Sequence, residues 1–412
     1  MPATARQLRY GREAQFPLEV PPAVMAGTHY APASIDDVAG AAATALAEPI
    51  DFPAFREAVV PGDRVVIALQ PGVPSAAELI AAVWDVLVDR GVDPADVTIL
   101  QPPRLDLRTE PDPRSALPEV AAEAISWRTH DALEESELAY LATSSSGERV
   151  YLAKALVDAD LVLPIGLVEF DAVLGYQGTA GGLFPALSNL EAIKRHGAIA
   201  HAELTPDDSR TARVVADEVG WLLGVQFVLQ AVRGSGSGLS HVMGGLSDAV
   251  FEEGKRLLRD GWRLELPQRA DLVLASVDAG PVGTDWADLI RAADAASKLA
   301  TRGGRVVLLS DLKAGPGSLS DALAIIRESA TIEEAQQVLP ALKSVDQPLA
   351  MRLLRVLSRC ELFVLADVAS ELAEALFFNV VESEDEVRRL LATADRIAVL
   401  EGGQHLETRI AS

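Results

Sequence analysis

Residues 63–103 read DRVVIALQPGVPSAAELIAAVWDVLVDRGVDPADVTILQPP, and this stretch decides the fold. Its first segment, 63–71, is a short apolar run rich in β-branched residues and predicts a strand. Residues 75–91 carry apolar side chains at helical spacing and end at a glycine, so they predict an amphipathic helix. Residues 96–103 predict the next strand. A strand, a helix and a second strand in this order form a βαβ unit with parallel strands.

The same alternation returns twice further along the chain. Segments 159–168 and 225–232 predict strands with helices at 187–200 and 211–224 between them, and 270–280, 285–304 and 305–315 form a second clear βαβ unit. We therefore expect an α/β protein of two domains with parallel or mixed sheets flanked by helices. Segment 261–270 separates a long helix from a strand, and it suggests domains at 1–266 and 267–412. Ligands of such folds bind at the carboxyl ends of strands, and we expect an active-site cleft between the domains.

The composition narrows the classes of function. The chain has 412 residues, of which 49% are hydrophobic, enough for two or three domain cores. The 60 acidic residues outnumber the 36 Lys and Arg, and the net charge of -24 disfavours nucleic-acid and anionic-membrane partners, which need a basic surface. Cys360 is the only cysteine, which excludes a disulfide framework and a Cys-rich metal site. The sequence has no apolar signal segment and no apolar run long enough to span a membrane, so we expect a cytoplasmic protein. A homo-oligomer is compatible with the sequence.

Four loops follow predicted strand ends, at 70–75, 101–109, 170–189 and 278–285. None contains the motif of a phosphate-binding loop, a serine-hydrolase elbow, a Cys/His metal cluster or a zinc protease. The third loop, FDAVLGYQGTAGGLFPALSN, holds four glycines and one tyrosine but no Lys, His or Cys. A backbone without Cβ atoms can approach a flat cofactor closely and present its N–H groups. The glycines at 233–241 instead predict a hairpin turn, because no helix opens after them.

The third loop, read in its context PIGLVEFDAVLGYQGTAGGLFPALSN, resembles a loop of the lactate racemase family, whose members use a nickel-pincer nucleotide. The family form is P-H-x-x-A-G-[YF]-S-G-G-x-K-x-x-x-P-G, and Gly175, Tyr176, Gly178 and Pro185 stand in the same frame. DRVVIALQPGVPSAAELI takes the place of a family strand and loop ending in D-x-T-R-P, and DVTILQPPRLDLRT that of T-I-L-x-A-T-G-x-H-R-P-x-T. The resemblance covers most of the chain and implies that the 1–266 domain carries the glycine-rich cofactor loop at 171–188.

Most of the family's catalytic positions are replaced in this sequence. The Lys that carries the cofactor through a covalent link falls on Gly181, so covalent attachment there is impossible. One of the two proton-transfer histidines falls on Asp171. By the same resemblance, the second histidine falls on Leu105 or Asp106. The Arg that binds the substrate carboxylate falls on Val73, and the Asp next to it falls on Gln70.

The nickel ligand and the C-terminal cation are the positions that keep their chemistry. The nickel-ligating His matches His201, with His196 as second candidate, although His196 also fits a helix end before a C-cap glycine. The Lys of the C-terminal helix becomes Arg291, and the Gln before it becomes Asp288. Arg291 either clamps a carboxylate or phosphate or lies on the solvated face of its helix. A lone His such as His201 is otherwise a common surface residue.

Two residues of the loop have competing interpretations. Asp171 lies two residues after Glu169, where burial and repulsion would raise the pKa of one carboxyl toward the range of a general base. It also fits an Asx-turn at a strand end. Tyr176 either stacks on a ring of the cofactor or packs inside the loop.

The resemblance implies an isomerase: a racemase or epimerase of a 2-hydroxy acid or related small hydroxyl compound, but not of lactate itself. A hydride would pass through a non-covalently bound nickel-pincer nucleotide, pyridinium-3,5-bisthiocarboxylic acid mononucleotide with nickel. His201 would ligate the nickel, and Asp171 and Arg291 would be catalytic. The alternative is a non-catalytic cofactor-binding or regulatory paralogue. The predicted cofactor contacts are Gly175, Tyr176, Gln177, Gly178, Thr179, Gly181, Gly182 and Gln70.

Overall fold

A computed structural model describes residues 6–104, 108–197, 204–315, 319–342, 344 and 346–411. The chain divides into two compact units. Unit 1 comprises residues 1–33, 235–237 and 261–412, and unit 2 comprises 34–234 and 238–260. The sequence suggests a domain boundary near residue 266, and the chain passes from unit 2 into unit 1 at residue 261. The two divisions differ in one respect, because the first 33 residues belong to the unit that holds the C-terminal half of the chain.

Unit 2 is built on a six-stranded sheet with the order β13-β12-β9-β4-β5-β6, in which only the β12–β13 pair is antiparallel. That pair is the hairpin predicted at 233–241. The strands are β4 Val65–Leu69, β5 Val97–Gln101, β6 Ser126–Thr129, β9 Leu161–Leu167, β12 Phe227–Arg233 and β13 Leu239–Leu246. The helices are α1 Val38–Ala47, α2 Ala76–Asp89, α3 Glu119–Ala124, α4 Lys154–Val157, α5 Leu190–Gly197, α6 Thr211–Leu222 and α7 Ser247–Trp262.

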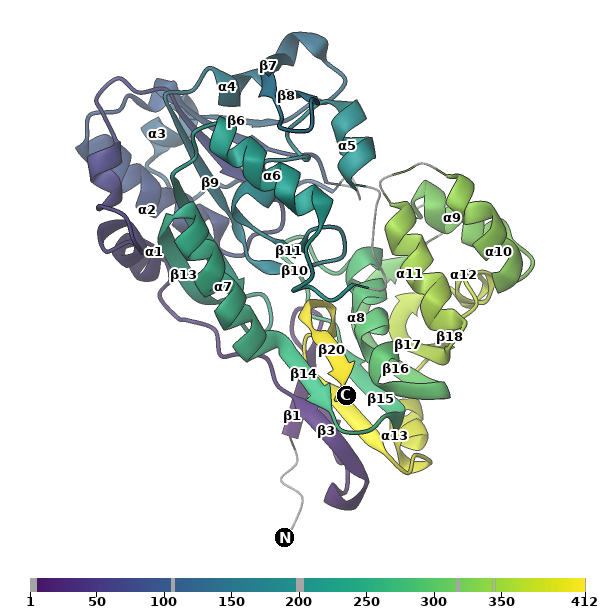
Figure 1. Ribbon diagram of the computed structural model, residues 1–412. Helices are drawn as coiled ribbons and strands as arrows, with labels where there is room; N and C mark the ends of the chain where they lie inside the picture. Colours follow the sequence, from purple (N-terminus) through teal and green to yellow (C-terminus); the bar gives the residue numbers. More distant parts are fainter. Residues whose placement is uncertain are drawn as a thin grey trace. The chain divides into compact units, whose positions relative to one another are not determined.

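Strand β4 explains why helices cover both faces of this sheet. Its residues are all buried, and successive side chains point to opposite faces. Val65, Ile67 and Leu69 pack in a core with α1 and α2, whereas Val66 and Ala68 pack in a second core with α4 and α6. Figure 1 shows α1 and α2 on one side of this sheet and α6 on the other. Each of the buried Val, Ile and Leu side chains contributes roughly 1.5–3 kcal/mol.

Unit 1 contains a fully parallel sheet with the order β18-β17-β16-β15-β19-β3. Its strands are β3 Met25–His29, β15 Ala270–Ser276, β16 Ala300–Ala314, β17 Cys360–Val368, β18 Asn379–Val381 and β19 Ile397–Leu400. The helices are α8 Trp286–Leu299, α9 Asp321–Glu328, α10 Ile332–Val338, α11 Gln347–Leu357, α12 Ser370–Ala375 and α13 Glu384–Ala392. Two small sheets complete the unit: β1 Arg6–Tyr10 with β2 Ala14–Leu18, and β14 Arg263–Leu266 with β20 Glu407–Ile410.

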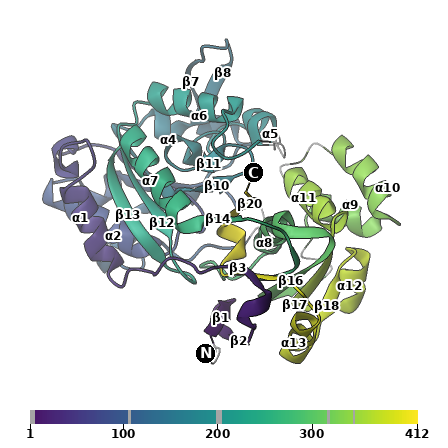
Figure 2. The same cartoon turned by 60° about the horizontal axis from the view of Figure 1, so that its bottom comes forward.

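The N-terminal segment is an integral part of unit 1. Strand β3 pairs with β19 and forms the edge of the sheet. Leu8 and Phe16, from the β1–β2 hairpin, are buried in one core with Val387 and Leu391 of α13, and Figure 2 shows the hairpin and α13 at the same end of the unit. In the described part of the chain no helix is both long and apolar enough to span a membrane.

Candidate functional site

The sheet of unit 2 has its topological switch point between β4 and β9. From β4 the chain proceeds to β5 and β6 on one side, whereas β9 is followed by β12 on the other. Ligands of open α/β sheets bind at this point, outside the carboxyl ends of the strands. The loop after β4 begins at Gln70 and contains Gly72, and the segment after β9 contains Glu169.

Two partly buried Arg–Glu pairs meet at Gly72. Arg104 Nη1 lies 2.8 Å from Glu110 Oε1, and the same oxygen accepts the N–H of Gly72 at 3.0 Å. Arg233 Nε donates to Glu169 Oε1 at 2.6 Å, and Arg233 Nη2 donates to the carbonyl of Gly72 at 3.0 Å. The four side chains are between 12% and 25% exposed. This arrangement places two guanidinium groups and two carboxylates around one loop.

Sequence reasoning missed Arg104, Glu110 and Arg233 and noted Glu169 only as a neighbour of Asp171, because the four residues come from separate segments of the chain. A signal was present for three of the four, since each of these follows or ends a strand: Arg104 after β5, Glu169 after β9 and Arg233 at the end of β12. Parallel strands bring such residues to one edge of the sheet. Val73, the position that corresponds to the family's carboxylate-binding Arg, is buried and only 4% exposed.

The glycine-rich loop begins with a two-stranded turn, β10 Glu169–Asp171 paired with β11 Gly175–Gln177. Asp171 Oδ1 accepts the N–H groups of Val173 at 2.8 Å and Leu174 at 2.6 Å. This is the Asx-type turn that the sequence allowed as one of two interpretations. The carboxylate therefore has a structural task in the loop, and its predicted role as a general base stays a prediction.

Tyr176 packs inside the loop. It is 4% exposed and its ring contacts those of Phe170 and Phe251. Its hydroxyl donates to Asp207 Oδ1 at 2.5 Å. Of the two roles considered from the sequence, packing is the one that the described contacts support.

The space beside three of the four loop glycines is filled by the protein itself. A Cβ on Gly175 would lie 2.5 Å from the carbonyl oxygen of Pro206, and one on Gly178 3.1 Å from that of Leu167. A Cβ on Gly181 would lie 3.0 Å from Leu174 Cδ1 and 3.2 Å from Arg213 Nη1. Gly182 differs from these, because nothing lies within 4 Å of its Cβ position. Gly182 is thus the glycine of this loop with room for a bound group.

Polar side chains also hold the loop in place through hydrogen bonds. Arg213 donates to the carbonyls of Tyr176 and Gly178 at 3.3 and 3.1 Å and to the hydroxyl of Thr179 at 3.1 Å. The remaining predicted contact residues are engaged as well: Gln177 Nε2 donates to the carbonyl of Gly181, Gln230 Oε1 accepts the N–H of Thr179, and Gln70 Oε1 accepts the N–H of Leu167. The loop is therefore a rigid, self-supported turn rather than an open strand of glycines.

Arg291 and Asp288 form a pair at the start of α8 in unit 1. Arg291 Nη2 donates to Asp288 Oδ1 at 2.6 Å, and 41% of the Arg291 side chain is exposed. Asp285 and Asp288 form a capping box at the helix N-terminus. Burial, with a further contribution from the charge of Asp285, raises the pKa of Asp288 to about 6, although Arg291 opposes the shift. Asp171 belongs to unit 2 and Arg291 to unit 1, and their joint action stays a prediction.

The predicted nickel ligand, His201, lies outside the described residues, as do Leu105 and Asp106. His196, the second candidate, has its Nε2 3.2 Å from both oxygens of Glu148, and its ring packs on Phe184. It is therefore held in a contact with Glu148 at the end of α5. Within the described ranges, no group of three or more His, Cys, Asp and Glu side chains could hold a metal ion.

Residues 10–206 match the family model of the lactate racemase N-terminal domain. This part of the chain is lactate racemase-like. The whole chain also has the fold of the lactate racemase apoprotein from Thermoanaerobacterium thermosaccharolyticum, with a TM-score of 0.79 and 16% identity over 98% of this chain and 99% of that one. A protein from Thermotoga maritima gives a TM-score of 0.65 and 11% identity, over 93% of this chain and 100% of that one. No curated protein matches the sequence.

These comparisons confirm two predictions made from the sequence, the lactate racemase-like family and the α/β fold class. At 11–16% identity the likeness to the solved structures concerns the fold alone. The Arg104–Glu110 pair, its contact with Gly72, Glu169 and the glycine-rich loop fall within the matched part of the chain, whereas Arg233 and α8 lie beyond it.

Proposed function

We propose that this lactate racemase-like protein is an isomerase, a racemase or epimerase of a 2-hydroxy acid or a related hydroxyl compound other than lactate. The observation that carries the proposal is the two partly buried Arg–Glu contacts at Gly72. A hydroxy acid offers a carboxylate, which guanidinium groups bind well. The partly buried glutamates at the same loop are of the residue type suited to move a hydroxyl proton. Arg104 and Arg233 would thus supply the cations that Val73 does not.

The proposed cofactor is a nickel-pincer nucleotide held without a covalent bond, which when bound would accept the hydride of the substrate carbon and return it to the other face. The described residues fit this group at one position of the loop. Gly182 leaves open space, whereas the surroundings of Gly175, Gly178 and Gly181 are filled. The role of the chain's own residues there is to keep the loop rigid through Arg213 and Gln230.

The test is native mass spectrometry with nickel analysis on protein co-expressed with a cofactor-producing pathway, followed by chiral chromatography of a panel of 2-hydroxy acids. We expect a nickel-bearing adduct of nucleotide size in the native spectrum only, and interconversion of the enantiomers of at least one compound. A protein that carries neither nickel nor an adduct, and that interconverts nothing, would rule the proposal out.

Arg233→Gln is the informative variant for the substrate end of the site. Loss of a hydrogen bond from a charged donor costs about 1.5–3 kcal/mol, so we expect kcat/KM to fall about 10- to 100-fold while the cofactor stays bound. Arg64→Gln is the matched control, because Arg64 pairs with Asp160 at 3.0 Å on the exposed surface at the start of β4. Equal activities of the two variants would remove Arg233 from the site.

One observation favours the alternative, a non-catalytic cofactor-binding or regulatory paralogue. The position of the family's attachment lysine, Gly181, is packed against Leu174 and Arg213. A binding protein needs no covalent attachment and no proton-transfer residue. This alternative predicts the nickel-bearing adduct without interconversion of any hydroxy acid, so the same two measurements separate it from the isomerase.

A further inference from the structure

A pocket lies in unit 2 near the edge strand β6, with a volume of about 190 Å³. Its floor is apolar and made of small or aliphatic side chains: Leu100 of β5, Ala153 at the end of β8 Arg149–Ala153, and Ala155 of α4. Its charged residues are Arg128 of β6, Asp131, which follows β6 and His130, and Glu137, which precedes β7 Leu138–Thr143. Pockets for drug-sized ligands measure about 300–1,000 Å³, so this one suits only a compact molecule.

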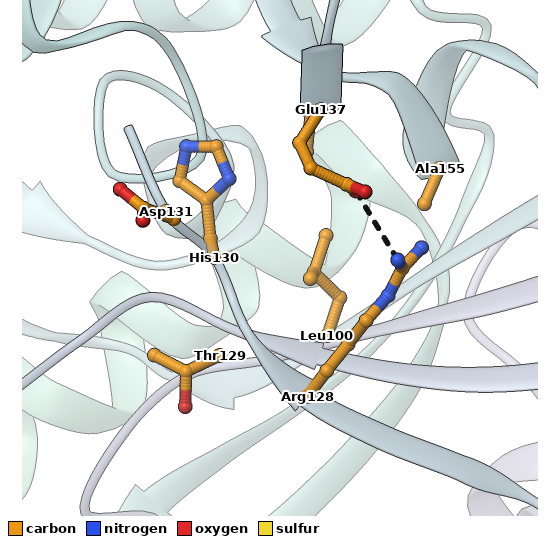
Figure 3. Close-up of a pocket in the computed structure, with 8 residues that line it drawn as sticks. Leu100, Arg128, Thr129, His130, Asp131, Glu137 and Ala155 are labelled. Carbon is orange, nitrogen blue, oxygen red and sulfur yellow. Dashed lines mark hydrogen bonds and ion pairs between the residues drawn. The ribbon is translucent and has the colours of Figure 1, made fainter. Parts of the chain in front are cut away.

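An ion pair joins two sides of this pocket. Arg128 Nη1 lies 3.2 Å from Glu137 Oε2, and the side chains are 42% and 51% exposed. Figure 3 shows them reaching toward each other, with Ala155 beside the contact. Exposed pairs of this kind are worth about 0–1 kcal/mol, so a ligand can replace the contact at little cost.

His130 adds a directed polar group to the same pocket. Its side chain is 5% exposed, and its Nε2 lies 2.8 Å from the carbonyl oxygen of Ser188. A carbonyl only accepts, so Nε2 carries the proton and Nδ1 of the neutral ring is an acceptor. In Figure 3 the ring nitrogen next to the side-chain attachment points to the side where Arg128 and Glu137 meet.

The charges of the pocket decide which ligand it fits. A simple carboxylate that took Arg128 would leave Glu137 without its partner and beside a like charge. A simple amine that bound Glu137 would leave Arg128 without its partner and beside a second positive charge. A molecule with both charges gives each side chain a new partner, and its ammonium group finds a second acceptor in His130 Nδ1.

We infer that this pocket binds a small zwitterionic α-amino acid, with its carboxylate on Arg128, its ammonium on Glu137 and a short side chain on the apolar floor. This inference is independent of the proposed isomerase activity, because it uses none of the residues at the switch point. The His130 contact with Ser188, the last part of the 171–188 loop, gives the pocket a direct connection to that loop.

The test is isothermal titration calorimetry of the full-length protein with glycine and L-alanine at low ionic strength. Propionate, ethylamine and L-tryptophan serve as ligands that lack the ammonium, lack the carboxylate or exceed the volume. We expect glycine or alanine to bind at least tenfold more tightly than each of these three. No binding of glycine or alanine at millimolar concentration, or equal binding of propionate or ethylamine, would overturn the inference.

Arg128→Gln and Glu137→Gln assign the binding to this pocket. Both side chains are exposed, so the fold should be retained, as circular dichroism would check, and each change should weaken amino-acid binding at least tenfold. Arg388→Gln is the matched control, because Arg388 forms exposed pairs with Glu384 and Asp385 on α13 of the other unit. Unchanged affinity in both pocket variants would place the binding elsewhere and contradict the inference.

Discussion

At the scale of single residues, some structural features of the glycine-rich loop could be predicted from its sequence and others could not. Its glycines and its position after a strand were readable from the sequence, and so was the Asx-turn at Asp171 as one alternative. The use of the space beside the glycines was not readable, because it depends on Pro206, Leu167 and Arg213, which reach the loop only in the folded chain. The glycines serve close packing at three positions and leave room at one.

Gly175→Ala tests this account by its effect on stability. Gly175 has φ +80° and a filled Cβ position, whereas Gly224 has φ +78° and nothing within 4 Å of its Cβ position. Gly224→Ala therefore bears only the backbone strain, about 1 kcal/mol, and Gly175→Ala should lose about 1–3 kcal/mol more through the clash with Pro206 and Arg210. Urea unfolding of the two variants and the parent measures the difference. An equal loss of unfolding free energy in both variants would mean that the loop accommodates a Cβ atom at Gly175 without an added cost.

At the scale of elements, helix α8 was predicted well because its signals are local. The sequence predicted a helix over 285–304, and the structure has it from Trp286 to Leu299 with Asp285 as its cap. The extra residues at its end belong to β16, which begins at Ala300. The electrostatics of the helix were less accessible from the sequence, because they depend on how deeply each carboxylate is buried and on Arg355 of α11.

Two aspartates of α8 predict opposite pH effects on stability. Folding raises the pKa of Asp288 from 3.8 to about 6, so the folded state binds more protons between these values and the free energy of unfolding falls as the pH rises through them. Asp288→Asn removes this loss, and at pH 7.5 we expect it to raise the free energy of unfolding by up to about 3 kcal/mol, with a smaller gain at pH 4.5. Urea unfolding at both pH values checks this, and a gain that does not depend on pH would contradict the assignment.

Asp294→Asn is the opposite-sign control in the same helix. Burial opposes ionisation of Asp294, but the charges of Lys298, Arg352 and Arg355 together lower its pKa below 3.8. Its ionised form therefore stabilises the fold above that pH, and the stabilisation is lost as the pH falls through the lowered pKa. We expect Asp294→Asn to reduce the free energy of unfolding at pH 7.5, where Asp288→Asn raises it.

At the scale of the whole molecule, the alternation of strands and helices predicted the fold class and two units, but the N-terminal segment escaped prediction. The described residues 6–33 contain no α-helix and precede a long stretch of unit 2, so nothing local places β3 beside β19. That pairing joins residues more than 360 positions apart in the chain. Long-range strand pairing of this kind is set by the completed sheet and leaves little trace in the segment itself.

This placement predicts how the chain can be divided. Residues 34–234 and 238–260 form one compact unit, so the fragment 34–260 should fold and unfold cooperatively alone. Residues 261–412 alone would leave β19 as an uncovered edge and lack Leu8 and Phe16 from the core, which exposes an edge prone to aggregation. Joining 1–33 to 261–412 through a short glycine linker should restore folding, because Pro32 lies directly against Gly261. Soluble yield, circular dichroism and urea unfolding of the three fragments provide the measurement. Equal solubility and equal unfolding midpoints of 261–412 with and without 1–33 would show that the N-terminal segment is dispensable to unit 1.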